Sequence, residues 1–337
     1  MFKRSRAPKD VLAEVERREK EAKRLGLLPR MFRGGDFEVR RFAGPERWVQ
    51  QLGGLRVTHL TDLHVGRVTP MDVQREAVAI TNGQAADLVV LTGDFVCHSL
   101  NYLDELTDTL KGLEAPAIAV LGNHDYWAGG EEVQRALERA GVLVLRNEHT
   151  LLTLRGEKLQ VVGLDDAYTG HADLRAATRG LRTDVPTLGL SHIGEEADAL
   201  WDKGAALVLA GHTHAGQVTL AGLHELAVGK LAGHKYVHGI YGSRRAETAP
   251  AGALYVGAGV GAAVMPLRLG ERARREVTSF ELGHAPGTLD EHHDDQPALK
   301  GRAPTAATRA RRAAAVVKKK EKRAAKNGGS TFRLDEK

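Results

Sequence analysis

Side chains that bind metal ions through nitrogen or oxygen occur in five short groups along this sequence. The groups are Asp62 with His64, Asp94, Asn123 with His124 and Asp125, His192, and His212 with His214. Each group alone has an ordinary explanation, because Gly, Asp and Asn are common in turns and a single His after a strand is usually a loop residue. Two His that flank one residue make an unusual turn. Because all five groups occur together, the sequence predicts a metal centre.

The types of donor atom restrict which metal ions can bind. Carboxylate, imidazole and amide donors without thiolate suit first-row divalent ions such as Mn, Fe or Zn. The only cysteine, Cys97, cannot build a thiolate site, and we expect it to be a free buried thiol. We therefore expect two divalent metal ions as cofactors, with manganese among the candidates, and no organic cofactor.

Each carrier segment begins with a short apolar run that leads directly into the polar residues. The runs cover residues 55–61, 88–92, 117–121, 187–191 and 206–210. Continuous apolar runs bounded by Gly and polar residues predict strands that are buried on both faces. In open sheets of this kind, ligands gather at the carboxyl ends of the strands. Five strand ends can therefore place their side chains around one point.

Helical patterns alternate with these strands, which predicts a layered α/β fold. The predicted helices cover residues 71–83, 101–113, 131–140 and 172–180. With 337 residues and 42% hydrophobic content, the chain can bury a full core. The single set of motifs indicates one enzyme domain rather than two.

The ordered motifs resemble those of the calcineurin-like metallophosphoesterase superfamily. They are Asp62-x-His64, Gly93-Asp94, Gly122-Asn123-His124-Asp125, His192 and Gly211-His212-x-His214. The resemblance covers about residues 37–282. It implies an α/β/β/α fold in which two facing mixed sheets are flanked by helices, with the metal site at the C-terminal ends of the strands.

Further segments resemble a bacterial branch of monodomain phosphodiesterases that is related to UDP-2,3-diacylglucosamine hydrolases. They include Gly163-Leu164-Asp165-Asp166, Lys235-Tyr236, Gly239-Ile240-Tyr241 and Leu254-Tyr255-Val256. Two places depart from the branch pattern. After Ser191-His192 the branch usually continues with Asn-Pro, and this chain continues with Ile193-Gly194-Glu195-Glu196. The Gly-rich loop 257–261 has Ala258 where the branch usually carries an Arg. That Arg would be a natural phosphate contact, so its absence leaves the substrate open.

The resemblance implies a role for each candidate residue. Asp62, His64 and His214 would hold one metal ion. Asn123, His192 and His212 would hold the other, and Asp94 would bridge the two. The expected catalytic residues are Asn123, His124 and Asp125: His124 would face the leaving group, and Asp125 would orient His124 through a hydrogen bond.

Such a centre has a clear chemistry. Two divalent ions about 3.5–4 Å apart can clamp a phosphoryl oxygen and lower the pKa of a shared water from about 15.7 toward 7. In-line attack by the resulting hydroxide, with His124 as general acid, would cleave a phosphodiester or pyrophosphate bond.

Several substrate classes remain open. The substrate could be a small phosphate ester, or a UDP-2,3-diacylglucosamine cleaved at the membrane surface during lipid A synthesis. A nucleic-acid-associated phosphoesterase recruited by the basic tail is a further alternative. A noncatalytic scaffold is disfavoured by the complete ligand set with His124. No obligate protein partner is evident.

Positive charge is concentrated at the two ends of the chain. Residues 1–35 carry 11 Lys and Arg against 5 acids, and residues 297–337 carry 13 against 3, although the net charge is only +5. We expect a basic N-terminal helical extension over 1–35, a metallophosphoesterase domain over 36–282 and a disordered basic tail over 283–337. A solubilising role explains the tail most simply, and contact with anionic lipid or nucleic acid is the functional alternative.

The sequence predicts no signal peptide and no membrane span. The basic start lacks an apolar segment of about 7–15 residues. The uncharged stretch 248–267 is interrupted by Pro250, Pro266 and several Gly, so it should form a strand and a Gly-rich loop beside the site rather than a spanning helix. We expect a cytoplasmic protein, with peripheral contact at the inner membrane face through its basic ends.

Overall fold

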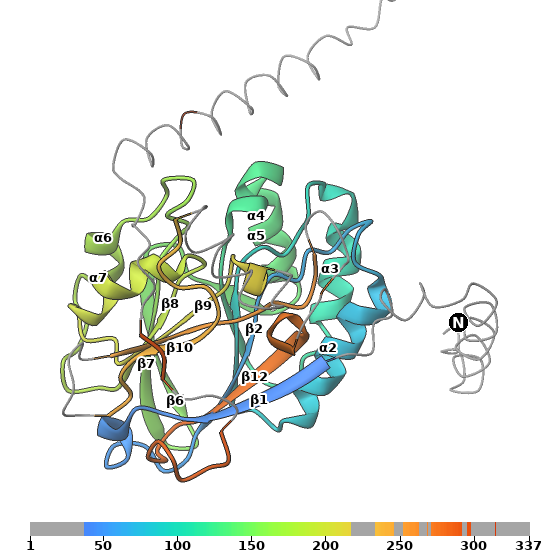
Figure 1. Ribbon diagram of the computed structural model, residues 1–337. Coiled ribbons are helices and arrows are strands. Elements are labelled where there is room, and N and C mark those ends of the chain that lie inside the picture. Colours follow the sequence, from blue (N-terminus) through green and yellow to red (C-terminus); the bar gives the residue numbers. More distant parts are fainter. Residues whose placement is uncertain are drawn as a thin grey trace, which may run out of the picture. The chain divides into compact units, whose positions relative to one another are not determined.

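The computed structural model of the chain describes residues 37–216, 233–245, 252–262, 268, 271–291, 295–297 and 314 (Figure 1). The predicted N-terminal extension and most of the predicted tail lie outside these residues. The division of the chain into extension, domain and tail therefore stays a prediction.

One mixed sheet is built from the first half of the domain and the last strand. Among the described residues it has six strands in the order β1-β12-β2-β3-β4-β5. The strands are β1 (Phe37–Ala43), β2 (Arg56–Leu60), β3 (Leu88–Thr92), β4 (Ala117–Val120), β5 (Val142–Val144) and β12 (Arg275–Glu281). Strand β12 runs antiparallel to β2, and the other neighbours run parallel.

The second mixed sheet also has six strands in the described part of the chain, in the order β10-β11-β9-β8-β7-β6. The strands are β6 (Glu148–Leu154), β7 (Glu157–Gly163), β8 (Thr187–Leu190), β9 (Leu207–Ala210), β10 (Gly239–Gly242) and β11 (Ala253–Val256). Strands β7, β8, β9 and β11 run parallel, and β6 and β10 run antiparallel to their neighbours.

The core explains why the strands are apolar on both faces. In β3, Leu88 and Val90 belong to a buried cluster that also contains Leu188 and Leu190 of the second sheet. The alternate residues of β3 pack in a separate cluster with the helices on the outer face of the first sheet. Because successive side chains of a strand point to opposite faces, the two sheets face each other across one core. The predicted α/β/β/α layering is confirmed.

Helices cover the outer faces of both sheets (Figure 1). They are α2 (Met71–Gly83), α3 (Leu103–Leu110), α4 (Asn123–Ala128), α5 (Gly130–Arg139), α6 (Leu174–Thr178) and α7 (Ala197–Trp201). Short 3-10 helices are η2 (Glu46–Trp48), η3 (Leu100–Tyr102), η4 (Gly194–Glu196), η5 (His214–Gly216) and η8 (Glu271–Ala273). Helix α2 has the predicted bounds, whereas the predicted helix over 101–113 is divided between η3 and α3. No helix in the described ranges combines the length and the apolar character needed to cross a bilayer.

The described part of the predicted tail contacts the domain. Arg244 is 5% exposed, and its Nη2 lies 2.7 Å from Glu291 Oε2 and 2.9 Å from Asp295 Oδ1. The backbone N–H of Gln296 donates to the carbonyl of Ile240 at 2.8 Å. Ion pairs thus hold Glu291 and Asp295 of the predicted tail against Arg244, although this part of the sequence has no apolar pattern.

Candidate metal centre

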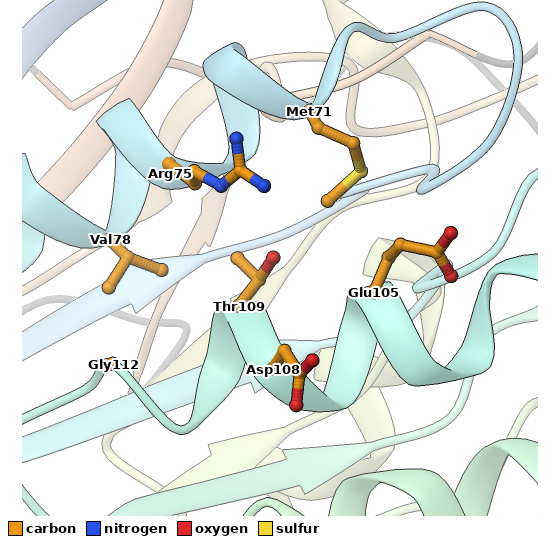
Figure 2. Close-up of a pocket in the computed structure, with 7 residues that line it drawn as sticks. All are labelled: Met71, Arg75, Val78, Glu105, Asp108, Thr109 and Gly112. Atoms are coloured by element: carbon orange, nitrogen blue, oxygen red, sulfur yellow. The ribbon is translucent and has the colours of Figure 1, made fainter. Parts of the chain in front are cut away.

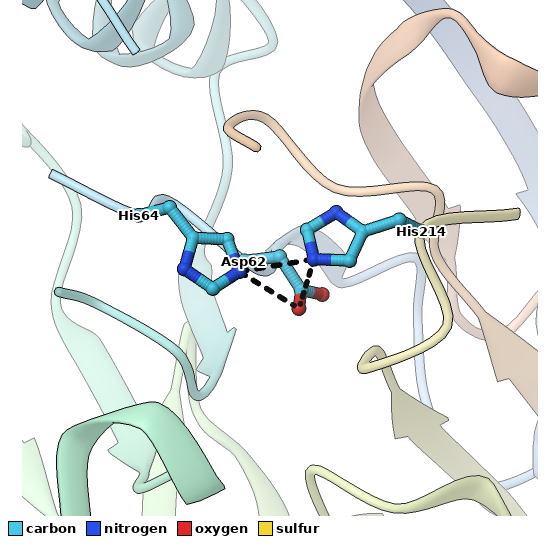
Figure 3. A group of neighbouring side chains, drawn as sticks. All are labelled: Asp62, His64 and His214. Carbon is cyan, nitrogen blue, oxygen red and sulfur yellow. Dashed lines mark hydrogen bonds and ion pairs between the residues drawn. The ribbon is translucent and has the colours of Figure 1, made fainter. Parts of the chain in front are cut away.

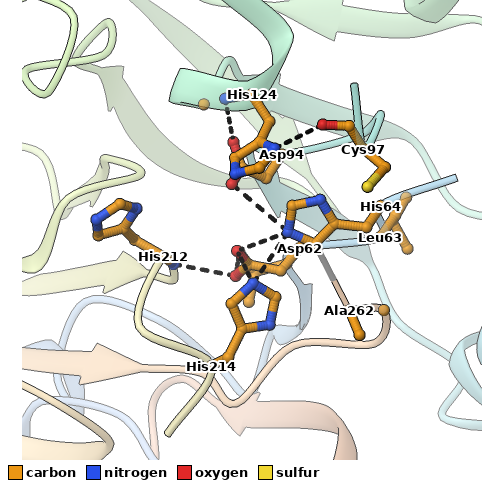
Figure 4. A network of polar contacts seen from close by, with 12 residues as sticks. Asp62, Leu63, His64, Asp94, Cys97, His124, His212, His214 and Ala262 are labelled. Atoms are coloured by element: carbon orange, nitrogen blue, oxygen red, sulfur yellow. Dashed lines mark hydrogen bonds and ion pairs between the residues drawn. The ribbon is translucent and has the colours of Figure 1, made fainter. Parts of the chain in front are cut away.

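The predicted ligands lie together at the C-terminal ends of parallel strands from both sheets. Figure 4 shows Asp62, His64, Asp94, His212 and His214 among them. Asp62 and His64 follow β2, Asp94 follows β3, and Asn123 begins α4 just after β4. The remaining ligands come from the second sheet, where His192 follows β8 and His212 and His214 follow β9. The structure brings all seven predicted ligands to one edge of the two sheets.

Tight turns allow the short segments to aim several side chains at one place. Five of the seven predicted ligands have backbone φ angles between 45° and 75°: Asp62, His64, Asp94, His212 and His214. This left-handed region is unfavourable for residues other than Gly. Backbone strain of this kind is typical of functional sites, where the surrounding structure holds it in place.

The first ligand group consists of Asp62, His64 and His214 (Figure 3). The Nε2 atoms of His64 and His214 are 2.9 Å apart. Asp62 Oδ1 lies 3.3 Å from His214 Nε2 and 3.8 Å from His64 Nε2. Two imidazole nitrogens and a carboxylate oxygen therefore converge as the ligands of a cation do.

The second group consists of Asp94, His192 and His212. His192 Nε2 is 3.3 Å from Asp94 Oδ2 and 3.3 Å from His212 Nδ1. His192 Nδ1 donates to the carbonyl of Thr92 at 2.7 Å, so Nε2 is the ring nitrogen that faces the other members of the group and can bind a metal.

Asp94 lies between the two groups. Its Oδ2 is 3.6 Å from His64 Nε2 of the first group and 3.3 Å from His192 Nε2 of the second. Its Oδ1 accepts the backbone N–H of His124 at 2.8 Å. One carboxylate therefore contacts both groups and also the segment that carries His124.

Unsatisfied buried atoms fit the presence of metal ions. Asp62 Oδ1 and Asn123 Oδ1 are buried and have no hydrogen-bond partner within the described residues. Buried polar groups are almost always paired, because leaving one unpaired costs about 1–3 kcal/mol. Both atoms are oxygens of the kind that divalent ions bind.

The electrostatics also favour metal binding. Burial lowers the pKa of His64 and of His214 to about 3, so both rings are neutral, as a metal ligand must be. Burial alone would lower the pKa of His192, but the Asp94 carboxylate raises it to about 10. Burial would likewise raise the pKa of Asp94, but His192 and then His124 hold it well below its usual value. Asp94 is therefore ionised, and it attracts positive charge at the point where the groups meet.

His124 lies beside the centre, and one of its two ring nitrogens is already hydrogen-bonded to the backbone. Its Nδ1 donates to the carbonyl of Cys97 at 2.6 Å (Figure 4). A carbonyl oxygen only accepts, so Nδ1 carries the hydrogen, and Nε2 is the atom that can meet a substrate. Cys97 itself is a buried thiol that forms no disulfide, as predicted.

The prediction that the Asp125 side chain hydrogen-bonds to the His124 ring is wrong. Asp125 Oδ1 accepts the backbone N–H groups of Phe95 at 2.8 Å and Val96 at 3.1 Å, and Oδ2 accepts that of Gly122 at 2.9 Å. The Nδ1–H of His124 is instead donated to the Cys97 carbonyl. Burial and then Asp94 raise the pKa of Asp125 to about 8, whereas its three donors favour the ionised form. Asp125 therefore positions His124 through the backbone of α4.

The Gly-rich loop holds an arginine that sequence reasoning missed. Ala258 replaces the Arg expected there, but Arg268 donates to the carbonyl of Ala258 at 2.8 Å and to that of Gly261. Its Nη2 is 3.4 Å from His214 Nδ1. The loop also packs on a ligand: Gly259 has φ +79°, and a Cβ there would be 2.7 Å from Asp62 Cβ. No sequence motif places Arg268 in this loop.

The other departure from the branch pattern has a structural role. Glu195 is buried, and its Oε1 accepts the backbone N–H of Lys235 at 2.9 Å. The same oxygen lies 3.1 Å from His234 Nδ1. The ring of His234 contacts the ring of His212 with centroids 5.3 Å apart, so Glu195 supports the surroundings of a predicted ligand.

A separate pocket of about 290 Å³ lies between α2 and α3 (Figure 2). Its lining residues are Met71, Arg75, Val78, Glu105, Asp108, Thr109 and Gly112. None of these is a predicted ligand, so this pocket is not part of the metal centre.

Comparison with known proteins identifies the family. Residues 55–216, which include all seven predicted ligands, match the family of calcineurin-like phosphoesterases. Phosphodiesterase YaeI of Escherichia coli (strain K12) is 31% identical over 236 residues, 67% of this chain and 82% of YaeI. The Bacillus subtilis (strain 168) proteins YkuE and YkoQ, both named uncharacterized metallophosphoesterases, are each 28% identical over 68% of this chain. These matches cover 79% of YkuE and 83% of YkoQ. The chain thus belongs to the calcineurin-like phosphoesterase family and is a metal-dependent hydrolase of phosphate esters.

Proposed function

We propose that this enzyme cleaves phosphodiester bonds at a dinuclear metal centre. Asp62, His64 and His214 hold one ion. Asn123, His192 and His212 hold the second, and Asp94 bridges the two. The position of Asp94 between two groups of imidazoles carries this proposal.

The chain's own residues supply the rest of the mechanism. When bound by these residues, two divalent ions would supply a hydroxide nucleophile at neutral pH and would stabilise negative charge on the phosphoryl oxygens. His124 gives a proton from Nε2 to the departing ester oxygen, while the Cys97 carbonyl holds its Nδ1–H. The carbonyl oxygen of Asn123, which is buried and has no hydrogen-bond partner in the described residues, would be its metal ligand. Its amide N–H would stabilise the developing charge.

The name of the relative YaeI supports a phosphodiester as the substrate class. Hydrolysis of UDP-2,3-diacylglucosamine, recruitment to nucleic acid and contact with the inner membrane through the basic ends stay predictions. The same holds for a cytoplasmic location and for manganese as the metal.

The test is hydrolysis of bis-p-nitrophenyl phosphate by metal-stripped protein that is re-supplied in turn with Mn, Fe, Zn, Ni and Mg. We expect at least one ion to restore activity and the metal content to reach two ions per chain. Asp94→Asn should lower activity by more than about 100-fold, because even residues that only support metal ligands contribute about 10- to 100-fold. Asp184→Asn is the matched control, since Asp184 is an exposed carboxylate paired with Arg182. A single bound ion in the fully active enzyme, or full activity in Asp94→Asn, would contradict the dinuclear centre.

A further inference from the structure

A continuous row of aromatic rings borders the metal centre. The ring centroids of His124 and Trp127 are 4.8 Å apart, those of Trp127 and Tyr168 are 5.9 Å apart, and those of Tyr168 and His212 are 5.1 Å apart. Trp127 and Tyr168 thus connect the predicted general acid to a ligand of the second metal group. Both side chains are partly exposed. We call this pair of rings the aromatic wall.

Trp127 is positioned by the same helix as His124. It lies three residues further along α4, so the two side chains share one face of the helix. The first turn of α4 is held by the buried Asp125, whose carboxylate accepts hydrogen bonds from the backbone N–H groups of Phe95 and Gly122. The backbone that carries Trp127 is therefore held in place together with that of His124.

Tyr168 is carried by a loop that a buried carboxylate pins. Asp166 is fully buried. It accepts the backbone N–H of Tyr168 at 3.2 Å, and the backbone N–H and hydroxyl of Thr169 at 2.6 and 2.5 Å. Three donors on one carboxylate fix the turn that presents the tyrosine ring.

The same loop is also tied to α4. Asp165 accepts the hydroxyl of Tyr126 at 2.5 Å. The ring of Tyr126 stacks on His171, with centroids 3.7 Å apart and an angle of 11°. The two elements that carry the wall are thus joined, and a binding surface held in this way is preorganised.

We propose that the aromatic wall is a subsite for a planar aromatic group of the substrate, such as an aryl or nucleobase ring joined to the phosphate. The inference rests on the proposed function and names its substrate class. Planar rings of many different chemical structures stack on the faces of Trp and Tyr side chains. Because the two wall rings meet edge to face at 77°, the ligand ring lies against the wall rather than between its members. An acyl chain gains hydrophobic contact there but no stacking.

Binding of two matched phosphonates to the metal-loaded protein tests this subsite. Phenylphosphonate and cyclohexylphosphonate have similar size and the same acid group, but only the first is planar. We expect calorimetry to show tighter binding of phenylphosphonate. Trp127→Ala and Tyr168→Ala should weaken its binding by about 5- to 100-fold, the range for loss of one stacking contact, and should abolish the preference. Trp127→Phe and Tyr168→Phe should keep the preference because they keep a ring.

Leu151→Ala is the control, since Leu151 is an apolar side chain of β6 that is 42% exposed and is not a member of the wall. Equal or tighter binding of cyclohexylphosphonate by the unaltered protein would overturn the proposal in favour of an apolar-chain subsite. A phenyl preference that survives both alanine variants would also overturn it. Because binding is measured without turnover, a negative result for the aromatic wall can be distinguished from a negative result for the proposed function. Aryl preference without hydrolysis of any phosphodiester contradicts the proposed function, whereas hydrolysis without aryl preference contradicts only the wall.

Discussion

At the scale of single residues, backbone carbonyls decide which imidazole nitrogens face the centre. Thr92 holds Nδ1 of His192, and Cys97 holds Nδ1 of His124. In both rings Nε2 is then the nitrogen that points away from the backbone carbonyl. The same type of hydrogen bond therefore orients a predicted metal ligand and the proposed general acid.

The general-acid role of His124 predicts an asymmetry between substrates. An alkoxide leaving group needs a proton, whereas p-nitrophenolate leaves without one. His124→Ala should slow hydrolysis of alkyl phosphodiesters by about 10²- to 10⁴-fold and that of bis-p-nitrophenyl phosphate much less. Steady-state kinetics with both esters measure this, with metal content determined to show that the centre is intact. Equal slowing of both esters would exclude the role.

The sequence predicts the ligands better than their supports. Asp, Asn and His residues directly after apolar runs can be recognised in the sequence, because an apolar run followed by metal-binding side chains is typical of the end of a buried strand at a site. The carbonyl of Cys97 carries none, since every residue has a carbonyl. Arg268 was missed for a related reason: it reaches the Gly-rich loop through space from ten residues downstream of Ala258.

At the scale of elements, close backbone packing holds the ligands in their strained turns. The loop after β11 lies against the turn after β2, where Val260 N–H donates to the Thr61 carbonyl at 3.0 Å and Gly261 N–H to the Asp62 carbonyl at 2.7 Å. At Gly261 this approach requires glycine, because an added Cβ would lie 2.7 Å from the carbonyl carbon of Leu63. The Gly-rich pattern predicted a loop beside the site, and the described part of this loop confirms it.

Gly259→Ala should therefore damage the metal centre. A new Cβ at Gly259 would be 2.7 Å from Asp62 Cβ, and the residue has φ +79°. Gly180→Ala is the matched control, because Gly180 has φ +93° but a Cβ added there would meet nothing within 4 Å. Both variants carry the cost of about 1–2 kcal/mol for a left-handed residue with a Cβ. Only Gly259→Ala should also weaken metal binding, by about 10- to 100-fold. Metal titration of both variants is the measurement, and equal affinities would show that the contact is unimportant.

At the scale of the whole molecule, the limits of the domain were the hardest feature to predict. Apolar periodicity locates strands and helices, and residues 283–297 have little of it. The structure holds this segment by charge, since Glu291 and Asp295 contact a buried arginine of the domain, Arg244. Sequence periodicity cannot detect such an anchor, because isolated acids in a polar segment are usually exposed.

Two truncated chains, which end at Pro297 and at Leu282, test where the domain ends. A chain that ends at Pro297 keeps both carboxylates beside Arg244, so its free energy of unfolding should equal that of the full-length protein. A chain that ends at Leu282 loses both carboxylates, and the Ala43 carbonyl at 3.1 Å is the remaining described hydrogen-bond acceptor of the guanidinium. Loss of a hydrogen bond to a charged group costs about 1.5–3 kcal/mol, which for a domain of this size lowers the melting temperature by about 3–12 °C. Thermal unfolding of both chains, with Glu291→Gln in the full-length protein as a milder version of the same loss, measures this. If both truncated chains melt at the same temperature, the domain ends at Leu282 and the ion pairs do not stabilise it.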